Sequence, residues 1–200
     1  MLKESMLMCD STEGDGKAEI VMDYVMSWSL RHATDNYINE KPILSKYCRY
    51  MLGKLLDTTI GDTVCVKSVE VWREWQYMDL CVEAIIEKEG VDHNYALLIE
   101  NKYYSQLHDD QLKRYQAKFD EFYVLKRKET DDEWILKHKL VSCLEEQEKA
   151  ENMYGSDTNG TDFEILTFYK LIDETLWDKD KGEYKDSESE IFNEFWLRRW

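Results

Sequence analysis

Two acidic residues and a lysine stand at the ends of apolar segments in the middle of the chain. Asp79 precedes one apolar segment, and Glu100 and Lys102 come directly after the run Ala-Leu-Leu-Ile at 96–99. Residues two apart on a β-strand project from the same face, so Glu100 and Lys102 would lie side by side. Burying a carboxylate and an ammonium group costs free energy unless they are paired. The three residues are therefore candidates for chemistry, with a simple ion pair at a strand end as the alternative.

The candidates are expected to meet on a β-hairpin. The segments 79–87 and 95–102 have strand composition and flank a turn at 88–93, in which Gly90 is the expected point of reversal. If residues whose numbers sum to 181 face each other, Asp79 lies opposite Lys102 and diagonal to Glu100. The other face of this hairpin then carries core residues, namely Leu80, Val82, Ile86, Leu97 and Ile99. A slip of one residue would move Asp79 to the wrong face.

Two carboxylates beside a lysine have a definite chemistry. Carboxylate oxygens suit Mg²⁺, which commonly takes one or two of them and keeps several waters, and Mn²⁺ is the alternative ion. Such a cation lowers the pKa of a bound water and stabilises charge on a phosphodiester oxygen. Lys102 would then orient the water or stabilise the developing negative charge.

Four further residues are candidates for a supporting or substrate-binding role. Gln111 and Tyr115 are four apart on a helix expected over 105–123, so they share a face. A glutamine on an otherwise apolar stripe indicates that this face meets something polar, unless Gln111 only marks the edge of the stripe. Glu19, on a helix expected over 17–31, and Glu70, on a strand expected over 64–75, could each add a carboxylate. The alternative for both is surface charge.

The order of these residues resembles the PD-(D/E)XK nuclease superfamily. The pattern is Asp79, then Glu100-Asn101-Lys102 after an apolar run, then Gln111 and Tyr115 on the next helix. It is most similar to a bacterial branch whose strand reads Ile-Glu-Asn-Lys and whose helix reads Gln-Leu-x-x-Tyr. Glu19, the segment 26–30 and the helix at 43–56 resemble that branch's N-terminal helices, so the resemblance covers about residues 19–176.

The chain departs from the family pattern in two places. Asp79 follows a methionine where the superfamily often has proline. The branch usually carries a His-Gly pair between its first two helices, where this chain reads Asn-Glu-Lys-Pro-Ile at 39–43. Because the His-Gly pair is missing, the resemblance does not extend to a role of this loop in substrate binding. The proposed metal site does not depend on this loop.

The resemblance implies an α/β fold with a restriction-endonuclease-like core, in which a central mixed sheet is flanked by helices on both faces. It implies a metal-dependent nuclease that hydrolyses phosphodiester bonds of nucleic acid, with DNA as the expected substrate. Asp79 and Glu100 would hold the Mg²⁺, joined by the carbonyl of Ile99. Lys102 would position or activate the water, and Gln111 and Tyr115 would support the site or touch the substrate backbone.

The remaining elements follow from periodicity and turn residues. Helices are expected over 17–31, 42–56, 105–123, 145–154, 169–176 and 191–200, and strands over 64–75, 79–87, 95–102, 139–144 and 163–168. We expect a single domain over 1–200, with a flexible N-terminus at 1–16 and a charged loop at 177–189 before the C-terminal helix. That helix would dock on the core, or else bind a protein partner or a second copy of the chain.

The formal net charge of −16 is the main objection to a nucleic-acid enzyme, because phosphate binding requires Lys and Arg. The charge is uneven: residues 102–139 have nine Lys or Arg against eight Asp or Glu, a net of +1, whereas 140–200 have seven against sixteen, a net of −9. The alternative function is therefore a catalytically silent nuclease-fold protein that binds or regulates a protein partner. No apolar run approaches a membrane span, and the five cysteines form no Cys-x-x-Cys, which favours a cytoplasmic protein with reduced thiols.

Overall fold

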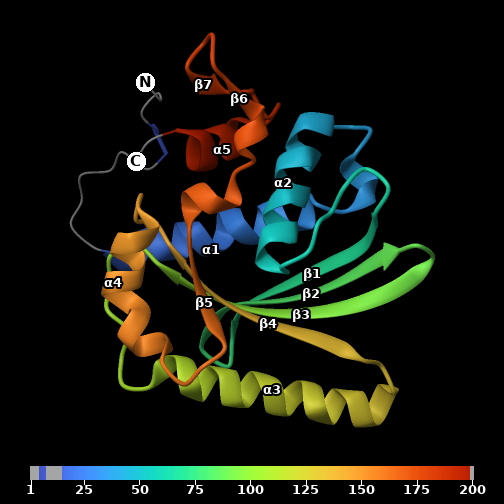
Figure 1. The fold of residues 1–200 in the computed structure, drawn as a ribbon, viewed down its shortest axis with the longest axis vertical. Helices are drawn as coiled ribbons and strands as arrows, with labels where there is room; N and C mark the ends of the chain where they lie inside the picture. Colours follow the sequence, from blue (N-terminus) through green and yellow to red (C-terminus); the bar gives the residue numbers. More distant parts are fainter. Residues whose placement is uncertain (1–4, 8–14, 199–200) are drawn as a thin grey trace.

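A five-stranded mixed sheet runs through the centre of the molecule (Figure 1). The structure is a computed structural model that describes residues 5–7 and 15–198. The strand order is β1-β2-β3-β4-β5, with the first three antiparallel and β4 and β5 parallel to β3. The bounds are β1 Cys65–Trp75, β2 Met78–Lys88, β3 Val91–Lys102, β4 Trp134–Ser142 and β5 Phe163–Thr167.

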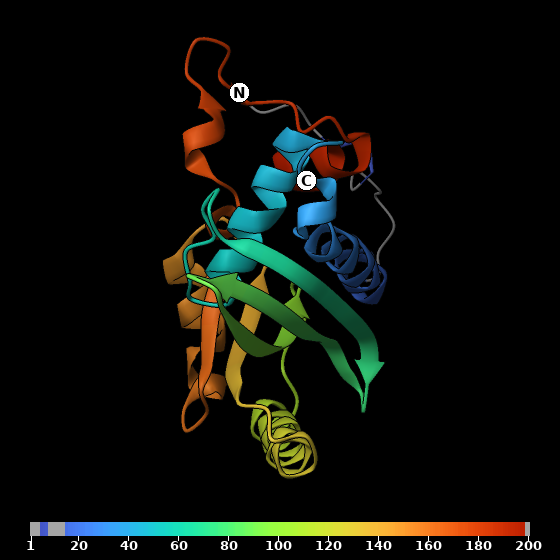
Figure 2. The ribbon, with the colours of Figure 1, turned by 90° about the vertical axis from the view of Figure 1, so that its right-hand side faces the viewer.

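Helices cover both faces of this sheet, as Figure 2 shows. On one face α1 (Asp15–Arg31) and α2 (Pro42–Leu55) enclose a core with Leu80, Val82, Leu97 and Ile99, the face that the sequence predicts for the hairpin. On the other face α3 (Gln111–Thr130) and α4 (Gln147–Thr158) pack on Ala96 and Leu98. The predicted α/β fold with a flanked mixed sheet is confirmed.

The β2–β3 hairpin forms with a different register from the one expected. Glu89 and Gly90 form its two-residue turn, both with positive φ (52° and 79°), as a tight hairpin turn requires. Leu80 pairs with Ile99, so the numbers of facing residues sum to 179 and not 181. Because this difference is two residues, every side chain keeps its face, and Asp79 comes opposite Glu100.

Two helices differ from the expectation in the face they bury or in their bounds. The spacing of apolar residues in the sequence predicts a buried face of α1 that includes Ile20, Tyr24 and Val25. In the structure Met22, Val25 and Met26 are buried, whereas Ile20 and Tyr24 are exposed. The helix expected over 105–123 begins six residues later and runs on to Thr130. The backbone of Asp110 is left-handed (φ 50°), which no helix interior accepts, so residues 105–110 form an irregular connection instead.

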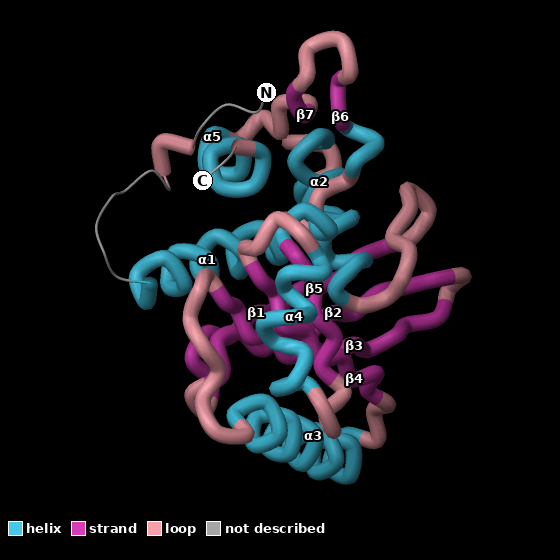
Figure 3. Tube along the Cα trace, turned by 60° about the vertical axis from the view of Figure 1, so that its left-hand side comes forward, coloured by secondary structure: helices cyan, strands magenta, loops and turns pink. Residues whose placement is uncertain are grey.

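The second half of the chain differs from the prediction in the bounds and types of its elements. β4 begins five residues before the expected strand, and α4 ends at Thr158, four residues beyond the expected end of that helix at 154. The helix expected over 169–176 is two short 3₁₀ turns, Phe168–Leu171 and Glu174–Leu176. The expected charged loop contains the small hairpin of β6 (Trp177–Asp178) and β7 (Glu183–Tyr184), which lies at the opposite end of the molecule from α3 (Figure 3).

The C-terminal segment docks on α1 and α2. It consists of α5 (Glu190–Phe192) and one π-helical turn, Asn193–Leu197. Phe192 and Phe195 are fully buried, and the indole nitrogen of Trp196 donates a hydrogen bond to Ser29 Oγ at 2.9 Å. The apolar face that the sequence offers to a protein partner is thus buried within the same chain.

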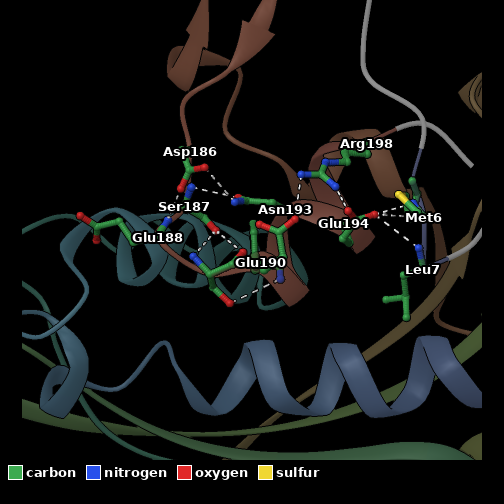
Figure 4. A network of polar contacts seen from close by, with 12 residues as sticks. Met6, Leu7, Asp186, Ser187, Glu188, Glu190, Asn193, Glu194 and Arg198 are labelled. Carbon is green, nitrogen blue, oxygen red and sulfur yellow. Dashed lines mark hydrogen bonds and ion pairs between the residues drawn. The ribbon is translucent and has the colours of Figure 1, made fainter.

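Polar contacts fix the other side of this segment (Figure 4). Glu194 Oε2 accepts backbone hydrogen bonds from Met6 and Leu7, and Arg198 pairs with both Glu190 and Glu194. The predicted flexibility of 1–16 concerns residues that mostly lie outside the described ranges.

Candidate active site

Asp79, Glu100 and Lys102 lie together on the sheet face that α3 covers. The ammonium nitrogen of Lys102 is 2.8 Å from Glu100 Oε1. Asp79 Oδ2 accepts a hydrogen bond from the backbone nitrogen of Asn101 at 2.8 Å, which ties the side chain on β2 to the backbone of β3. Glu100 is 1% exposed and Lys102 6%. The three candidates therefore form one cluster, in which the partly exposed Asp79 lies nearest to solvent.

Helix α3 adds the two residues that the sequence assigned to it. Gln111, the first residue of the helix, donates from Nε2 to Glu100 Oε1 at 2.6 Å. Tyr115 lies one turn further on, and its pKa is raised by partial burial and by the negative charges of Glu100 and Asp79. The polar partner expected for Gln111 is thus the Glu100 carboxylate.

Helix α1 brings two acidic side chains to the same end of β3. Glu19 Oε1 accepts a hydrogen bond from the backbone nitrogen of Tyr103 at 3.1 Å and another from the hydroxyl of Ser105. Asp23 Oδ1 accepts from the side-chain nitrogen of Asn101 at 2.7 Å and is buried. Asp23 was not singled out from the sequence. Its spacing of four residues from Glu19, which places both on one helix face, is the signal that could have found it.

The carboxyl groups of the cluster resist ionisation. Burial raises the pKa of Asp79 to about 6, against the opposing effect of the Asn101 N–H and the Lys102 charge. Burial and the nearby charge of Asp79 raise the pKa of Glu100 to about 8 and that of Asp23 to about 7. For Lys102, burial lowers the pKa, but the charges of Glu100, Glu19 and Asp79 outweigh it and raise the pKa overall. The cluster holds more negative charge than one lysine neutralises.

The donor set fits a hard divalent cation. Glu100 Oε1 is held by Lys102 and Gln111, whereas Oε2 is buried without a hydrogen-bond partner among the described residues. A buried carboxylate oxygen without a partner is costly, and a cation bound between Glu100 and Asp79 would satisfy it. Over the described residues, no three His, Cys, Asp or Glu side chains are grouped as a preformed metal site. Mg²⁺ does not require three, because it binds through one or two carboxylates and water.

Of the two remaining predicted residues, Glu70 lies apart from the cluster and Ile99 lies where it was expected. Glu70 pairs with Glu83 across β1 and β2, four residues along β2 from Asp79, so the structure does not bring it into the cluster. Ile99 sends its side chain into the core on the opposite face, so it could contribute only its backbone carbonyl. Glu74, the second-to-last residue of β1, is close enough for its charge to raise the pKa of Asp79.

Comparison with known proteins agrees with this arrangement. A hairpin that presents an aspartate and a Glu-x-Lys strand, inside a flanked mixed sheet, defines a restriction-endonuclease-like protein. The family model described as the PD-(D/E)XK nuclease superfamily matches residues 13–195, and the chain belongs to that superfamily, whose members are generally nucleases that use divalent metals. No curated protein and no solved structure matches the chain significantly. Within the described ranges, no helix combines the length and the apolar character needed to cross a membrane.

Proposed function

We propose that the protein is a metal-dependent nuclease that hydrolyses phosphodiester bonds of nucleic acid, with DNA as its substrate. The observation that carries this proposal is the Glu100 carboxylate. It is almost completely buried, one oxygen is held by Lys102 and Gln111, and the other has no partner in the described part of the chain. A carboxylate in a purely structural role would have both oxygens paired.

Asp79 and Glu100 would hold Mg²⁺ or Mn²⁺, with the carbonyl of Ile99 as a backbone ligand. When bound, such an ion lowers the pKa of a coordinated water and stabilises charge on the phosphodiester. The fixed position of Asp79, set by its hydrogen bond from the backbone of Asn101, keeps the two carboxylates together before substrate arrives. Asn101 in turn is held by Asp23, so α1 supports the strand end that carries the site.

Lys102 acts as a hydrogen-bond donor and a positive charge. Its raised pKa keeps it protonated near neutral pH, so it is suited to orient the attacking water or to stabilise negative charge on the phosphate, and not to remove a proton. Gln111 fixes Glu100 from the opposite side. Tyr115, which is partly exposed on the same helix, is placed to contact the substrate backbone.

Positive charge on α3 offsets part of the acidity of the chain. Lys113 and Arg114 are exposed in the first turn of α3, two and three residues after Gln111. Lys118 and the basic segment 126–128 continue along this helix. A nucleic-acid strand bound at the cluster would thus pass a helix with several cations, although the formal net charge of −16 keeps nonspecific binding weak.

A cleavage assay with matched variants tests the proposal. Wild-type protein should cut single- or double-stranded DNA in the presence of Mg²⁺ or Mn²⁺ and not in the presence of EDTA. Asp79→Asn should abolish cutting, and Asp132→Asn, the same change at an exposed position between α3 and β4, should leave it intact. Undiminished cutting by a purified, folded Asp79→Asn variant would refute the assignment. A folded wild type that cuts no nucleic acid would favour the alternative, a silent nuclease-fold protein that binds another protein.

A further inference from the structure

A groove lined by aromatic side chains lies beside the proposed active site, between the β1–β2 edge of the sheet and α3. Its volume is about 410 Å³, and the residues that matter here are Glu70, Trp72, Trp75, Cys81 and Phe122. We call it the aromatic groove. Neither the predicted metal site nor the hydrophobic core accounts for its open aromatic faces, since Trp72 is 40% exposed and Phe122 39%.

The aromatic groove is close to the cluster on the same face of the sheet. Cys81 on its floor is two residues from Asp79 along β2, which is about 7 Å on an extended strand. Trp72 pairs with Cys81 across the two strands. β1 is the edge strand of the five-stranded sheet, and no described strand covers its outer side. A nucleotide whose phosphate lies at Asp79 could therefore place its base over Trp72.

The chemistry of the lining favours a nucleobase over a phosphate. Trp75 and Phe122 meet edge to face with ring centroids 4.9 Å apart, so their orientation is fixed, and the exposed ring of Trp72 stands beside them. Glu70 makes no hydrogen bond or ion pair with the described residues, and its carboxylate can accept from an exocyclic amino group of a base. Glu83, the second carboxylate of the groove, is already bound by the Tyr123 hydroxyl at 2.8 Å and by Lys126.

We propose that the aromatic groove binds an unpaired base next to the scissile phosphate, so that the substrate is a single-stranded segment of nucleic acid. This inference rests on the proposed function. A base must be free of its duplex partner to stack on a side chain in this position. Stacking also explains how a chain with a net charge of −16 could hold nucleic acid, because stacking needs no positive charge whereas phosphate contacts do.

The test measures binding separately from cleavage. Fluorescence anisotropy with a labelled single-stranded oligodeoxynucleotide and with its duplex is performed in EDTA on the Asp79→Asn protein, which is expected not to cut. Adding Trp72→Ala should weaken single-strand binding by on the order of 10-fold or more, the effect of losing one stacked base, and leave duplex binding unchanged. Trp177→Ala, on the distant β6, is the matched control and should change neither.

Two milder variants guard against loss of folding. Trp72→Phe keeps an aromatic ring and should retain most of the affinity. Glu70→Gln should reduce the preference for adenine- or cytosine-rich strands over thymine-rich ones, because the neutral amide accepts less strongly from an exocyclic amino group and can also donate to a thymine carbonyl. If Trp72→Ala, shown to be folded by circular dichroism, binds single strands as tightly as its parent, or if a folded Trp72→Phe loses as much affinity as Trp72→Ala, the inference is wrong.

The outcomes separate this inference from the proposed function. If the wild type cuts nucleic acid and Trp72→Ala cuts single and double strands as well as the wild type does, the protein is a nuclease but the base site is rejected. If single-strand binding requires Trp72 but the protein cuts no nucleic acid with any divalent cation, the base site is supported and the hydrolytic function is rejected.

Discussion

Replacing Asp79 by asparagine removes a negative charge that the folded protein holds at a cost in stability. The carboxyl has a pKa of about 6 in the folded protein and 3.8 when exposed, because partial burial and the nearby charges of Glu19 and Glu74 disfavour its ionised form. At pH 8 it is ionised in both the folded and the unfolded protein, so the fold bears a cost of about 3 kcal/mol. Below pH 3.8 it is protonated in both, and the cost disappears.

The sign of the expected effect follows from this difference. Because the pKa of Asp79 is higher in the folded than in the unfolded protein, its protonated carboxyl favours the folded state relative to the ionised one. This contribution to stability is lost as the pH rises from about 4 to about 6. Asparagine resembles the protonated acid, and its carbonyl can still accept the hydrogen bond from Asn101. Its added N–H group must find a partner, which reduces the gain. Asp79→Asn should therefore stabilise the protein at pH 8 by about 1–2 kcal/mol.

Urea unfolding in EDTA, followed by circular dichroism at pH 8 and pH 4, measures this effect. The gain at pH 8 corresponds to a rise in melting temperature of about 2–8 °C, and it should be largely absent at pH 4. Adding Mg²⁺ should stabilise the wild type and not Asp79→Asn, since only the wild type keeps both carboxylates. Loss of stability in Asp79→Asn at pH 8, or equal stabilisation of both proteins by Mg²⁺, would refute the view of Asp79 as a destabilising metal ligand.

Three further predictions concern the cluster and the core. Mg²⁺ binding should strengthen between pH 6 and pH 8 and release protons, because Glu100 has a pKa of about 8 and must ionise to act as a ligand. Calorimetry in two buffers of different ionisation enthalpy measures the number of protons released. Binding without proton release would contradict this prediction. Lys102→Met should abolish cutting but tighten Mn²⁺ binding in calorimetry, because a competing cation 2.8 Å from Glu100 is removed; weaker Mn²⁺ binding would oppose this role. Phe195→Ala should destabilise the protein by about 3–5 kcal/mol in urea unfolding, as expected for a fully buried ring, and a loss below about 1 kcal/mol would show that the C-terminal segment does not dock.

The sequence predicted the grouping of the central candidate residues better than the surroundings of that group. The alternation of apolar residues in the hairpin places Asp79, Glu100 and Lys102 on one face, and a shift of the register by an even number of residues does not change that face. The predicted register was wrong by two residues, and the cluster still formed. Gln111 was expected to meet something polar, and its side chain hydrogen-bonds Glu100, since its position on an apolar stripe does not depend on where the helix begins.

What the sequence left unpredicted depends on contacts between distant segments. Asp23 becomes part of the site only because α1 crosses the end of β3, where Asn101 reaches it from a position 78 residues away. Tyr24 was expected on the buried face of α1, but it is exposed beneath the guanidinium of Arg73, which lies 3.4 Å from its ring centroid. Trp72 is similarly ambiguous in sequence, because a tryptophan on a strand is usually a core residue and only the edge position of β1 leaves it open.

Cation binding tests the central claim most directly. Calorimetric titration of Mn²⁺ into the wild type, into Asp132→Asn and into the double variant Asp79→Ala with Glu100→Ala compares the site with a matched control. We predict binding to the wild type and to Asp132→Asn, and none to the double variant. Binding to the double variant with wild-type affinity would show that Asp79 and Glu100 do not hold the metal.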